Sequence, residues 1–373
     1  MKRIYIHGVG AVSGRGYGLE QHRQPWSQCR MSRYDGIGWG VSVHENVEAQ
    51  LKNFSSTLKK FDRATQLGVL AAELALMNSS FSYDKSKMGV VVGSSRGSTQ
   101  TLEEQYRLFL EGSAISSFCS PLTTAGVFSA AIAREFGLFG MQVSVSNACA
   151  TGLQAFGLAL SLVSSGVVPA CLTGGAEAPL TSFTFEQFKR LRLLSQHSAP
   201  WPLRPRESTG MALGEGAGCL VISSEKSDVL VRGFGSSSEE GSLTGVSNTA
   251  LSLQAAIVQC LGCSGLKISD IDLIVGHGVG TKVGDLAEKA GLEALGAKNI
   301  PWVSHKWALG HTLGAAGSLS IAFAVDMLRG AKIKNCSWYQ SKELDVDLHN
   351  ILVVAMGFGG IASAVLISKN LER

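Results

Sequence analysis

The feature that most constrains the fold is an internal duplication of a strand–helix–strand pattern. Each copy opens with an apolar strand that enters a glycine turn, continues with a segment of helical periodicity, and closes with an apolar strand that ends in small residues. These segments span residues 4–10, 60–77 and 88–94 in the first copy, and 229–235, 248–261 and 271–277 in the second. Alternating strands and helices predict an α/β fold with helices on both faces of the sheet.

Two apolar helices extend the repeat. Ala150-Thr151-Gly152 opens one, and Ala315-Ala316-Gly317 opens the other. Each helix ends at a glycine, the residue that most readily adopts the left-handed conformation of a helix end. We expect two packed halves, residues 1–227 and 228–373, related by a pseudo-twofold axis at which these helices meet.

Composition excludes several functional classes. The chain has 373 residues, of which 45% are hydrophobic and 17% charged, with a net charge of +4. This describes a compact protein with a large core, and the modest charge does not favour a nucleic-acid-binding protein. No apolar run is long enough to span a membrane, and the first residues read as a strand rather than a signal peptide. We therefore expect a cytoplasmic protein with reduced cysteines.

Two familiar motifs are weak here. Cys260 and Cys263 form a C-x-x-C pair, but the chain has no second such pair, so packing at a helix end is favoured over a redox or zinc role. Gly8 and Gly10 follow a strand, but the glycine spacing then departs from the dinucleotide-binding G-x-G-x-x-G pattern. Neither motif predicts a cofactor.

Cys149 is a candidate nucleophile. An alternating strand, residues 142–146, leads through small residues to Cys149 at the first turn of an apolar helix. A helix N-terminus carries partial positive charge, which favours the reactive thiolate. A buried cysteine that only packs at the strand–helix junction is an equal alternative from position alone.

Two histidines and a lysine form the other candidate site residues. His277 ends a buried strand among glycines, and His311 precedes the second apolar helix, with Lys306 a short distance before it. Each histidine alone is more often structural. The repeat, however, puts Cys149 and His311 at equivalent helix starts, which favours a shared site. A zinc site built from Cys149, His277 and His311 is disfavoured, because none has a closely spaced partner ligand.

Together these segments resemble the β-ketoacyl-acyl-carrier-protein synthases of the thiolase superfamily. The resemblance runs from about residue 4 to 368 in the order of the family. It is carried by the following motifs: Ala148-Cys149-Ala150-Thr151-Gly152, Gly174-Gly175-Ala176-Glu177, Leu213-Gly214-Glu215-Gly216-Ala217-Gly218, His277-Gly278-Val279-Gly280-Thr281 with Gly284-Asp285 and Glu288, Lys306 with Gly310-His311-Thr312-Leu313-Gly314-Ala315-Ala316-Gly317, and Gly357-Phe358-Gly359-Gly360.

The resemblance implies a fold and a reaction. The fold would be the thiolase-like duplicated αβαβα layered fold with two pseudo-twofold-related halves. Cys149 would accept an acyl group from an acyl carrier protein, and a malonyl extender would lose carbon dioxide beside His277 and His311. Backbone N–H groups of Cys149 and Phe358 would stabilise the oxyanion, and Lys306 would orient the site, paired with Glu288. The reaction needs no cofactor and no metal.

The resemblance also implies specificity and partners. Phe188 and Met356 match bulky family positions and would gate the acyl pocket. The family forms dimers through the strand before the nucleophile, so we expect a homodimer or a heterodimer with a related subunit. Basic residues would dock the acidic carrier protein in two clusters: Lys59, Lys60 and Arg63, and Lys189, Arg190 and Arg192.

The chain departs from the family at several positions. Val279 stands where the family usually has Thr, Met356 where it has Phe, and Ala362 where it has Asn, and a family Asp-x-x-Arg-Asp stretch is not kept around residues 205–209. These changes fit a specialised polyketide or polyene pathway better than housekeeping fatty-acid elongation. The alternative is a non-condensing partner of the chain-length-factor type, although such subunits usually lack the cysteine.

Overall fold

A computed structural model describes residues 2–23, 31–79, 81–197, 209–240, 243–331 and 347–371. The departure expected around residues 205–209 therefore lies almost entirely outside the described residues.

Most strands of the described residues belong to one 11-stranded sheet. Its strands are β1 (Ile4–Ser13), β2 (Gly16–Tyr17), β5 (Gly89–Gly93), β6 (Gln142–Val143), β7 (Ala170–Glu177), β9 (Gly216–Ser223), β10 (Val229–Ser238), β11 (Leu273–Val275), β12 (Trp302–Val303), β13 (Asn350–Gly357) and β14 (Ile361–Lys369). A small sheet holds β3 (Ser32–Tyr34), β4 (Gly38–Val41) and β8 (Leu213–Gly214).

The strand order confirms the duplication. From its centre outwards the first half reads β1-β9-β7-β5-β6 and the second reads β10-β14-β13-β11-β12. In both halves the first two pairings are antiparallel and the last two are parallel. β1 joins the halves, because Ile4–Ile6 pair with β10 of the second half, and β1 pairs along most of its length with β9 of the first half.

Helices separate and cover the two halves of the sheet. The α-helices are α1 (Leu19–Arg23), α2 (Glu45–Lys52), α3 (Arg63–Met77), α4 (Thr99–Leu110), α5 (Cys119–Thr123), α6 (Val127–Phe136), α7 (Thr151–Ser164), α8 (Ser182–Arg190), α9 (Leu251–Ser264), α10 (Lys282–Ala294), α11 (Lys306–Leu309) and α12 (Ala316–Leu328). Short 3-10 turns are η1 (Leu58–Lys60), η2 (Lys85–Lys87), η3 (Ile268–Asp270) and η4 (Leu313–Ala315).

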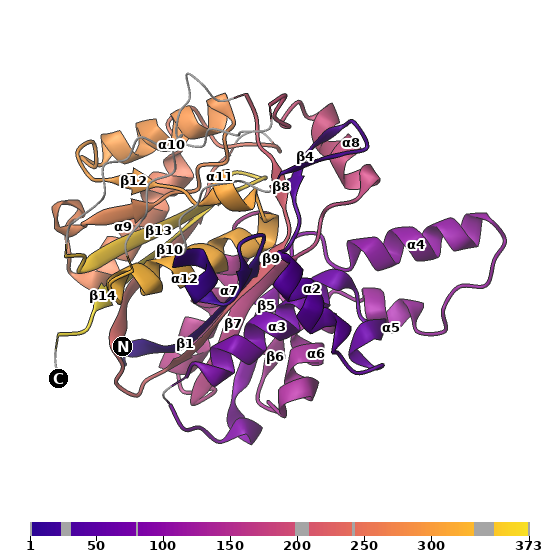
Figure 1. The fold of residues 1–373 in the computed structure, drawn as a ribbon. Helices are drawn as coiled ribbons and strands as arrows, with labels where there is room; N and C mark the ends of the chain where they lie inside the picture. Colours follow the sequence, from indigo (N-terminus) through magenta and orange to yellow (C-terminus); the bar gives the residue numbers. More distant parts are fainter. Residues whose placement is uncertain are drawn as a thin grey trace.

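The helices and sheet halves stack as five layers. α3 and α6 cover the outer face of the first half, α9 covers that of the second with α10 packed on it, and α7 and α12 lie between the halves (Figure 1). The result is the thiolase-like layered fold that the sequence predicts.

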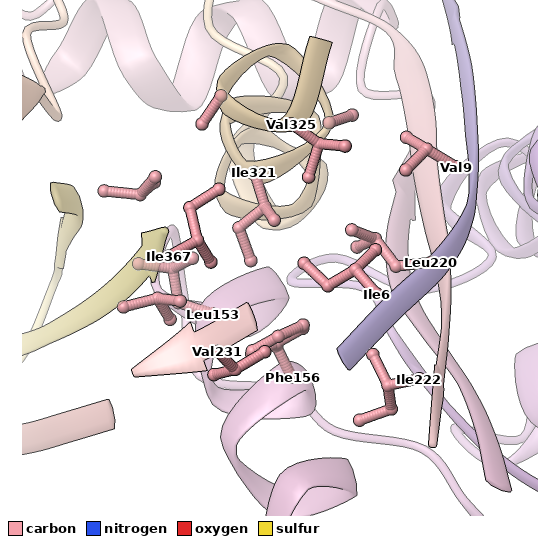
Figure 2. Close-up of a cluster of buried hydrophobic side chains, with 14 of the residues drawn as sticks. Ile6, Val9, Leu153, Phe156, Leu220, Ile222, Val231, Ile321, Val325 and Ile367 are labelled. Carbon is pink, nitrogen blue, oxygen red and sulfur yellow. The ribbon is translucent and has the colours of Figure 1, made fainter. Parts of the chain in front are cut away.

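The central helices meet at two glycines. A Cβ on Gly152 would lie 2.7 Å from the backbone nitrogen of Ser318, and one on Gly317 would lie 2.9 Å from that of Leu153. Real Cβ atoms do not approach so closely, so these glycines permit the contact between α7 and α12. The apolar core around them draws side chains from both halves, such as Phe156 from α7 and Ile321 from α12 (Figure 2).

Two further features bear on function. α4 projects away from the body of the molecule, with α5 beside its base (Figure 1). Among the described residues, no helix combines the length and apolar character needed to cross a membrane.

Candidate active site

Cys149 lies in the tight turn between edge strand β6 and central helix α7. Ala148, directly before it, has a φ of 46°, a left-handed conformation that costs energy for a residue with a Cβ. Thr151 fixes the turn: its hydroxyl donates to the Ala148 carbonyl at 2.7 Å and accepts the N–H of Asn147 at 2.8 Å. The turn presents the largely buried Cys149 side chain to a pocket lined by both halves.

His311 reaches Cys149 from the second half. Its Nε2 lies 3.1 Å from the Cys149 Sγ, which is hydrogen-bond distance for sulfur. The backbone of His311 is held on both sides, because its N–H donates to the Ala212 carbonyl at 2.7 Å and its carbonyl accepts the N–H of Gly214 at 2.9 Å. The His277 ring stands beside it, with ring centroids 5.4 Å apart. The structure therefore brings together the three side chains that the sequence singles out.

Glu288 holds the turn that carries His277. Its carboxylate, on α10, accepts the N–H of His277 at 2.6 Å and that of Gly278 at 2.7 Å. A Cβ on Gly276 would lie 2.7 Å from this carboxylate and 2.0 Å from Trp302 Nε1, so only glycine lets the carboxylate approach.

Lys306 is also bound to this turn, but differently from the prediction. Its ammonium group donates to the carbonyl of His277. Although both residues are described and buried, Lys306 and Glu288 form no direct ion pair; each holds the His277 backbone instead. Instead of pairing with each other as expected, Lys306 and Glu288 both bind the backbone of His277.

Burial dominates the protonation states of the site. It lowers the pKa values of His277 and His311 well below the ordinary histidine value, with the nearby Lys306 charge adding to the effect, so both rings are neutral at pH 7. Burial also lowers the pKa of Lys306 and raises that of Glu288. Within the described residues, no group of three or more His, Cys, Asp or Glu side chains is arranged to hold a metal ion.

The Cys149 thiol departs from expectation. Burial raises its pKa to about 12, while the Lys306 charge lowers it and the Glu177 charge raises it. The helix start predicted a stabilised thiolate, but the cost of placing that charge in a buried pocket is larger. The resting site therefore holds a neutral thiol beside a neutral imidazole.

The register of the repeat corrects a third expectation. Leu313 has a φ of 40°, the same unusual conformation as Ala148, and precedes Gly317 by as many residues as Ala148 precedes Gly152. Gly314, rather than His311, is thus the counterpart of Cys149. His311 lies three residues earlier, and its ring reaches Cys149 from there.

The pocket in front of Cys149 is narrow and mostly apolar. It encloses about 90 Å³. The two expected gate residues, Phe188 and Met356, line it, and the ring centroid of Phe188 lies 6.2 Å from that of Phe358. Sequence reasoning missed much of the remaining wall, because those residues come from segments without a motif: Leu193, Met211, Thr244, Gly245 and Val246.

Phe358 lies where an oxyanion donor is expected. It directly follows Gly357, and a Cβ on Gly357 would lie 3.3 Å from the backbone nitrogens of Cys149 and Ala150. The backbone of residues 357–358 thus passes beside the N–H of the nucleophile.

Two of the departures from the family pattern form one structural unit. Met356 on β13 pairs directly with Ala362 on β14, and both side chains belong to the same buried cluster. The side chains at positions 356 and 362 therefore lie in the same part of the core, so the volume of one side chain limits the volume available to the other. Val279, the third departure, lies in the pocket wall.

The expected docking cations fall into distinct groups. Lys59 and Lys60 are exposed, and the Lys60 ammonium lies over the ring of Phe118, 5.2 Å from its centroid. Arg63 corrects the expectation: its guanidinium donates to both oxygens of the buried Glu215 at 2.8 Å and also binds Glu48, so its charge is satisfied internally.

The second group of cations lies at the end of α8. Lys189 and Arg190 both pair with Glu186, and the three side chains are solvated. Arg192 follows the helix, exposed, with a φ of 58°.

Comparison with known proteins identifies the family. The profile described as "Beta-ketoacyl synthase, N-terminal domain" matches residues 7–228, and the corresponding C-terminal profile matches residues 229–338. The chain belongs to the β-ketoacyl synthase family. It is an acyltransferase-type condensing enzyme, as the sequence motifs predict.

Relatives of this β-ketoacyl synthase span its whole length. It is 27% identical to a 3-oxoacyl-[acyl-carrier-protein] synthase 2 of Staphylococcus aureus (strain COL), over 100% of this chain and 99% of the relative. It is 28% identical to a putative polyketide beta-ketoacyl synthase 1 of Streptomyces halstedii, over 98% of each chain. Both fatty-acid and polyketide relatives are thus at similar distance.

Solved structures share the fold. One is a type II PKS acyl-carrier protein in complex with its ketosynthase bound to the hexaketide (TM-score 0.87, 20% identity, 99% of this chain and 100% of that chain). Another is the ishigamide ketosynthase/chain length factor (TM-score 0.86, 23% identity, 99% of each chain).

Proposed function

We propose that this ketosynthase catalyses a decarboxylative Claisen condensation between an acyl group carried on Cys149 and malonyl-acyl-carrier protein, in a specialised polyketide or polyene pathway. The observation that carries the proposal is the Cys149 Sγ at 3.1 Å from His311 Nε2, with the neutral His277 ring beside it. A neutral imidazole can accept the thiol proton as the sulfur attacks a thioester.

Acyl transfer is the first step. The Cys149 sulfur bonds to the acyl carbon, the bond to the pantetheine sulfur breaks, and the thiol proton passes through His311 to the departing pantetheine thiolate. Because burial raises the pKa of the Cys149 thiol, proton acceptance by His311 has to accompany the attack. The backbone N–H groups of Cys149 and Phe358 would stabilise the oxyanion that forms.

Condensation follows. The carbon–carbon bond to the malonyl carboxylate breaks, carbon dioxide leaves, and its electron pair forms an enolate. Once Cys149 is acylated, the neutral His311 ring can carry its proton on Nε2, and N–H groups of His277 and His311 would then stabilise the enolate oxygen. The enolate carbon then attacks the acyl carbon, and the Cys149 thiolate leaves and takes a proton from solvent. Glu288 and Lys306 contribute by fixing the His277 turn.

The substituted pocket supports the specialised pathway. Met356 is unbranched and flexible, so it adapts to irregular or rigid acyl chains better than a phenylalanine ring. Its pairing with Ala362 supports a coordinated reshaping of the wall. Val279 offers no hydroxyl to the pantetheine arm.

The alternative function is a non-condensing partner of the chain-length-factor type. Two of the structural neighbours are named as complexes of a ketosynthase with a chain length factor. The presence of Cys149, His277, His311 and Lys306 together favours the condensing enzyme.

Mass spectrometry of the intact protein tests the proposal. Incubation with acyl-carrier substrates should add one acyl mass to the wild type and none to Cys149→Ala, and subsequent malonyl-carrier protein should release a β-ketoacyl product. His277→Ala should load acyl groups yet decarboxylate about 100-fold more slowly, whereas His311→Ala should slow acyl loading and slow decarboxylation still more. A wild-type protein that never loads would support the non-condensing role instead.

A further inference from the structure

Glu177, at the end of β7, is a buried carboxylate bound from several directions. Its exposure is 0%. Oε1 accepts the hydroxyl of Ser94 at 2.7 Å and the N–H of Arg96 at 3.2 Å. Oε2 accepts the N–H of Ser95 at 2.9 Å, the hydroxyl of Ser95 at 2.6 Å and the N–H of Gly314 at 2.9 Å.

These bonds join the two halves next to the active site. Residues 94–96 follow β5 in the first half, whereas Gly314 belongs to the second half and follows His311 in the same turn. A carboxylate is costly to bury unless donors surround it, and the donors here come from both segments. The end of β7 therefore holds the histidine turn against the first half.

Gly314 makes this contact specific. A Cβ on Gly314 would lie 2.7 Å from Glu177 Oε2 and 2.6 Å from the nitrogen of Ser95, so no larger residue fits. Gly314 is also the counterpart of Cys149 in the repeat. The N–H of Cys149 is the expected oxyanion donor, whereas the N–H of its counterpart Gly314 donates to the Glu177 carboxylate.

We propose that Glu177 is a positioning residue: its Oε2 holds the 311–314 turn so that His311 Nε2 stays within reach of the Cys149 sulfur. The other anchor of His311, its pairing with residues 212–214, holds the N–H and the carbonyl of His311 itself. Glu177 fixes the backbone after it. The turnover readout of this role rests on the proposed function, whereas the alkylation readout below does not.

The variant Glu177→Gln distinguishes the positioning role of the side chain from the effect of its negative charge. With its carbonyl at the Oε2 place, Glu177→Gln keeps the acceptor for Gly314 and Ser95. Its amide faces Ser94, whose hydroxyl can rotate to accept, and the variant gives up the longer bond from the Arg96 N–H. Glu177→Ala removes acceptor and charge together. The two variants thus have the same charge and differ in their hold on Gly314.

The electrostatic setting of Cys149 fixes the sign of the charge effect. The charged groups acting on its thiol are Lys306, which lowers its pKa, and Glu177, which raises it; His277 and His311 are neutral. Removing the Glu177 charge should move the alkylation profile of Cys149 to lower pH. This shift reports the charge of Glu177, whereas the comparison of the two neutral variants reports its position.

The test compares Glu177→Gln, Glu177→Ala and Gly314→Ala. Glu177→Ala should lower kcat for malonyl-carrier decarboxylation at least about tenfold with little change in KM, and Glu177→Gln should restore most of the rate. Gly314→Ala disrupts the same contact from the side of Gly314. The double variant Glu177→Ala with Gly314→Ala should therefore decarboxylate no more slowly than the slower of the two single variants. Rates are divided by the concentration of folded protein. Asp326→Ala is the matched control for stability, because it removes a buried carboxylate that is bound to Arg23.

Alkylation of Cys149 by iodoacetamide gives a second, function-independent readout. At one pH, Cys149 of Glu177→Ala should react several-fold more slowly than Cys149 of Glu177→Gln, because only the glutamine variant keeps His311 in place to accept the thiol proton. The pH profile of alkylation of Glu177→Gln should lie at lower pH than that of the wild type. The proposal is overturned if the two variants react equally or if the Glu177 and Gly314 effects add. A wild type without turnover would refute the proposed function, and the alkylation comparison would still decide the role of Glu177.

Discussion

Cys149 experiences opposing influences from burial and from its neighbours. Loss of hydration disfavours the thiolate, and Lys306 favours it, with the balance on the side of the thiol. Because the surroundings on balance do not stabilise the thiolate, the thiol needs a proton acceptor, and His311 provides one at hydrogen-bond distance. Reactivity is therefore expected when a substrate and His311 act together, rather than from a preformed thiolate.

This balance predicts the pH dependence of Cys149 alkylation. Because burial raises the thiol pKa above its ordinary value, the thiolate fraction grows throughout the neutral and mildly alkaline range, and the iodoacetamide rate should still be rising at about pH 9. Peptide mass spectrometry measures the rate, with the exposed Cys263 as internal reference. A plateau below about pH 7.5 would reveal a thiolate–imidazolium pair and contradict the prediction.

Lys306 provides the second prediction at the scale of a residue. Its ammonium group favours the Cys149 thiolate and binds the His277 carbonyl. Lys306→Ala should therefore slow condensation by about tenfold or more and move the alkylation profile of Cys149 to higher pH. Circular dichroism should show an intact fold. Normal turnover together with an unmoved profile would remove Lys306 from the site.

At the scale of elements, the strand pair β13–β14 sets the shape of the pocket. Met356 faces the pocket and Ala362 lies opposite it in the register. The side-chain volume available in this layer is shared, since buried groups are closely packed. A change at Met356 therefore reaches the substrate directly, and one at Ala362 reaches it through Met356.

Substitution of Met356 tests the gate. Met356→Phe should narrow the pocket and shorten the acyl chains that are accepted, and Met356→Ala should lengthen them. Product profiles from mixed acyl-carrier substrates measure the change. Ala362→Asn is the companion variant, and its effect should be non-additive with Met356→Phe because the two side chains are in contact. Identical profiles for all variants would argue against a gate.

At the scale of the whole molecule, the exposed features suggest where partners bind. β6 is the edge strand of the large sheet, and α6 packs on it, with α5 on α6. The projecting α4 leaves large apolar side chains exposed, among them Leu102, Tyr106, Phe109 and Leu110. Unpaired strand edges and clustered apolar side chains are features that association covers.

We predict a dimer, with itself or with a related subunit. Light scattering at micromolar concentration should give twice the mass of one chain, or the mass of a complex when the related subunit is added. Phe109→Asp with Leu110→Asp should weaken the assembly, whereas Val258→Asp, at an equally exposed position on α9, should not. A monomer under all these conditions would defeat the prediction.

Docking of the carrier protein is the second prediction at this scale. Lys60 and Arg192 are exposed, and an acidic carrier would be attracted to them over a short, salt-screened range. Reversal of both to Glu should raise the KM for carrier-bound substrate about tenfold or more and leave a small soluble thioester nearly unaffected. Lys226→Glu, between β9 and β10, is the control. Equal losses with both substrates would mean damage to the site itself.

The sequence by itself determined the elements and the family. The repeated pattern of strands and glycine turns predicted an α/β fold with two related halves, because apolar periodicity and turn residues act locally. The motifs around Cys149, His277 and His311 likewise predicted which side chains meet.

Only the tertiary structure decided the relations between segments. It assigned Gly314, not His311, as the counterpart of Cys149, because the left-handed turn at Leu313 fixes the register. It withdrew Arg63 from the docking surface by burying Glu215 beside it, and it joined Lys306 and Glu288 through the His277 backbone rather than by a direct ion pair. It raised the thiol pKa of Cys149 and surrounded Glu177 with donors from both halves. Each of these depends on burial and on contacts between distant segments, and local sequence pattern encodes neither.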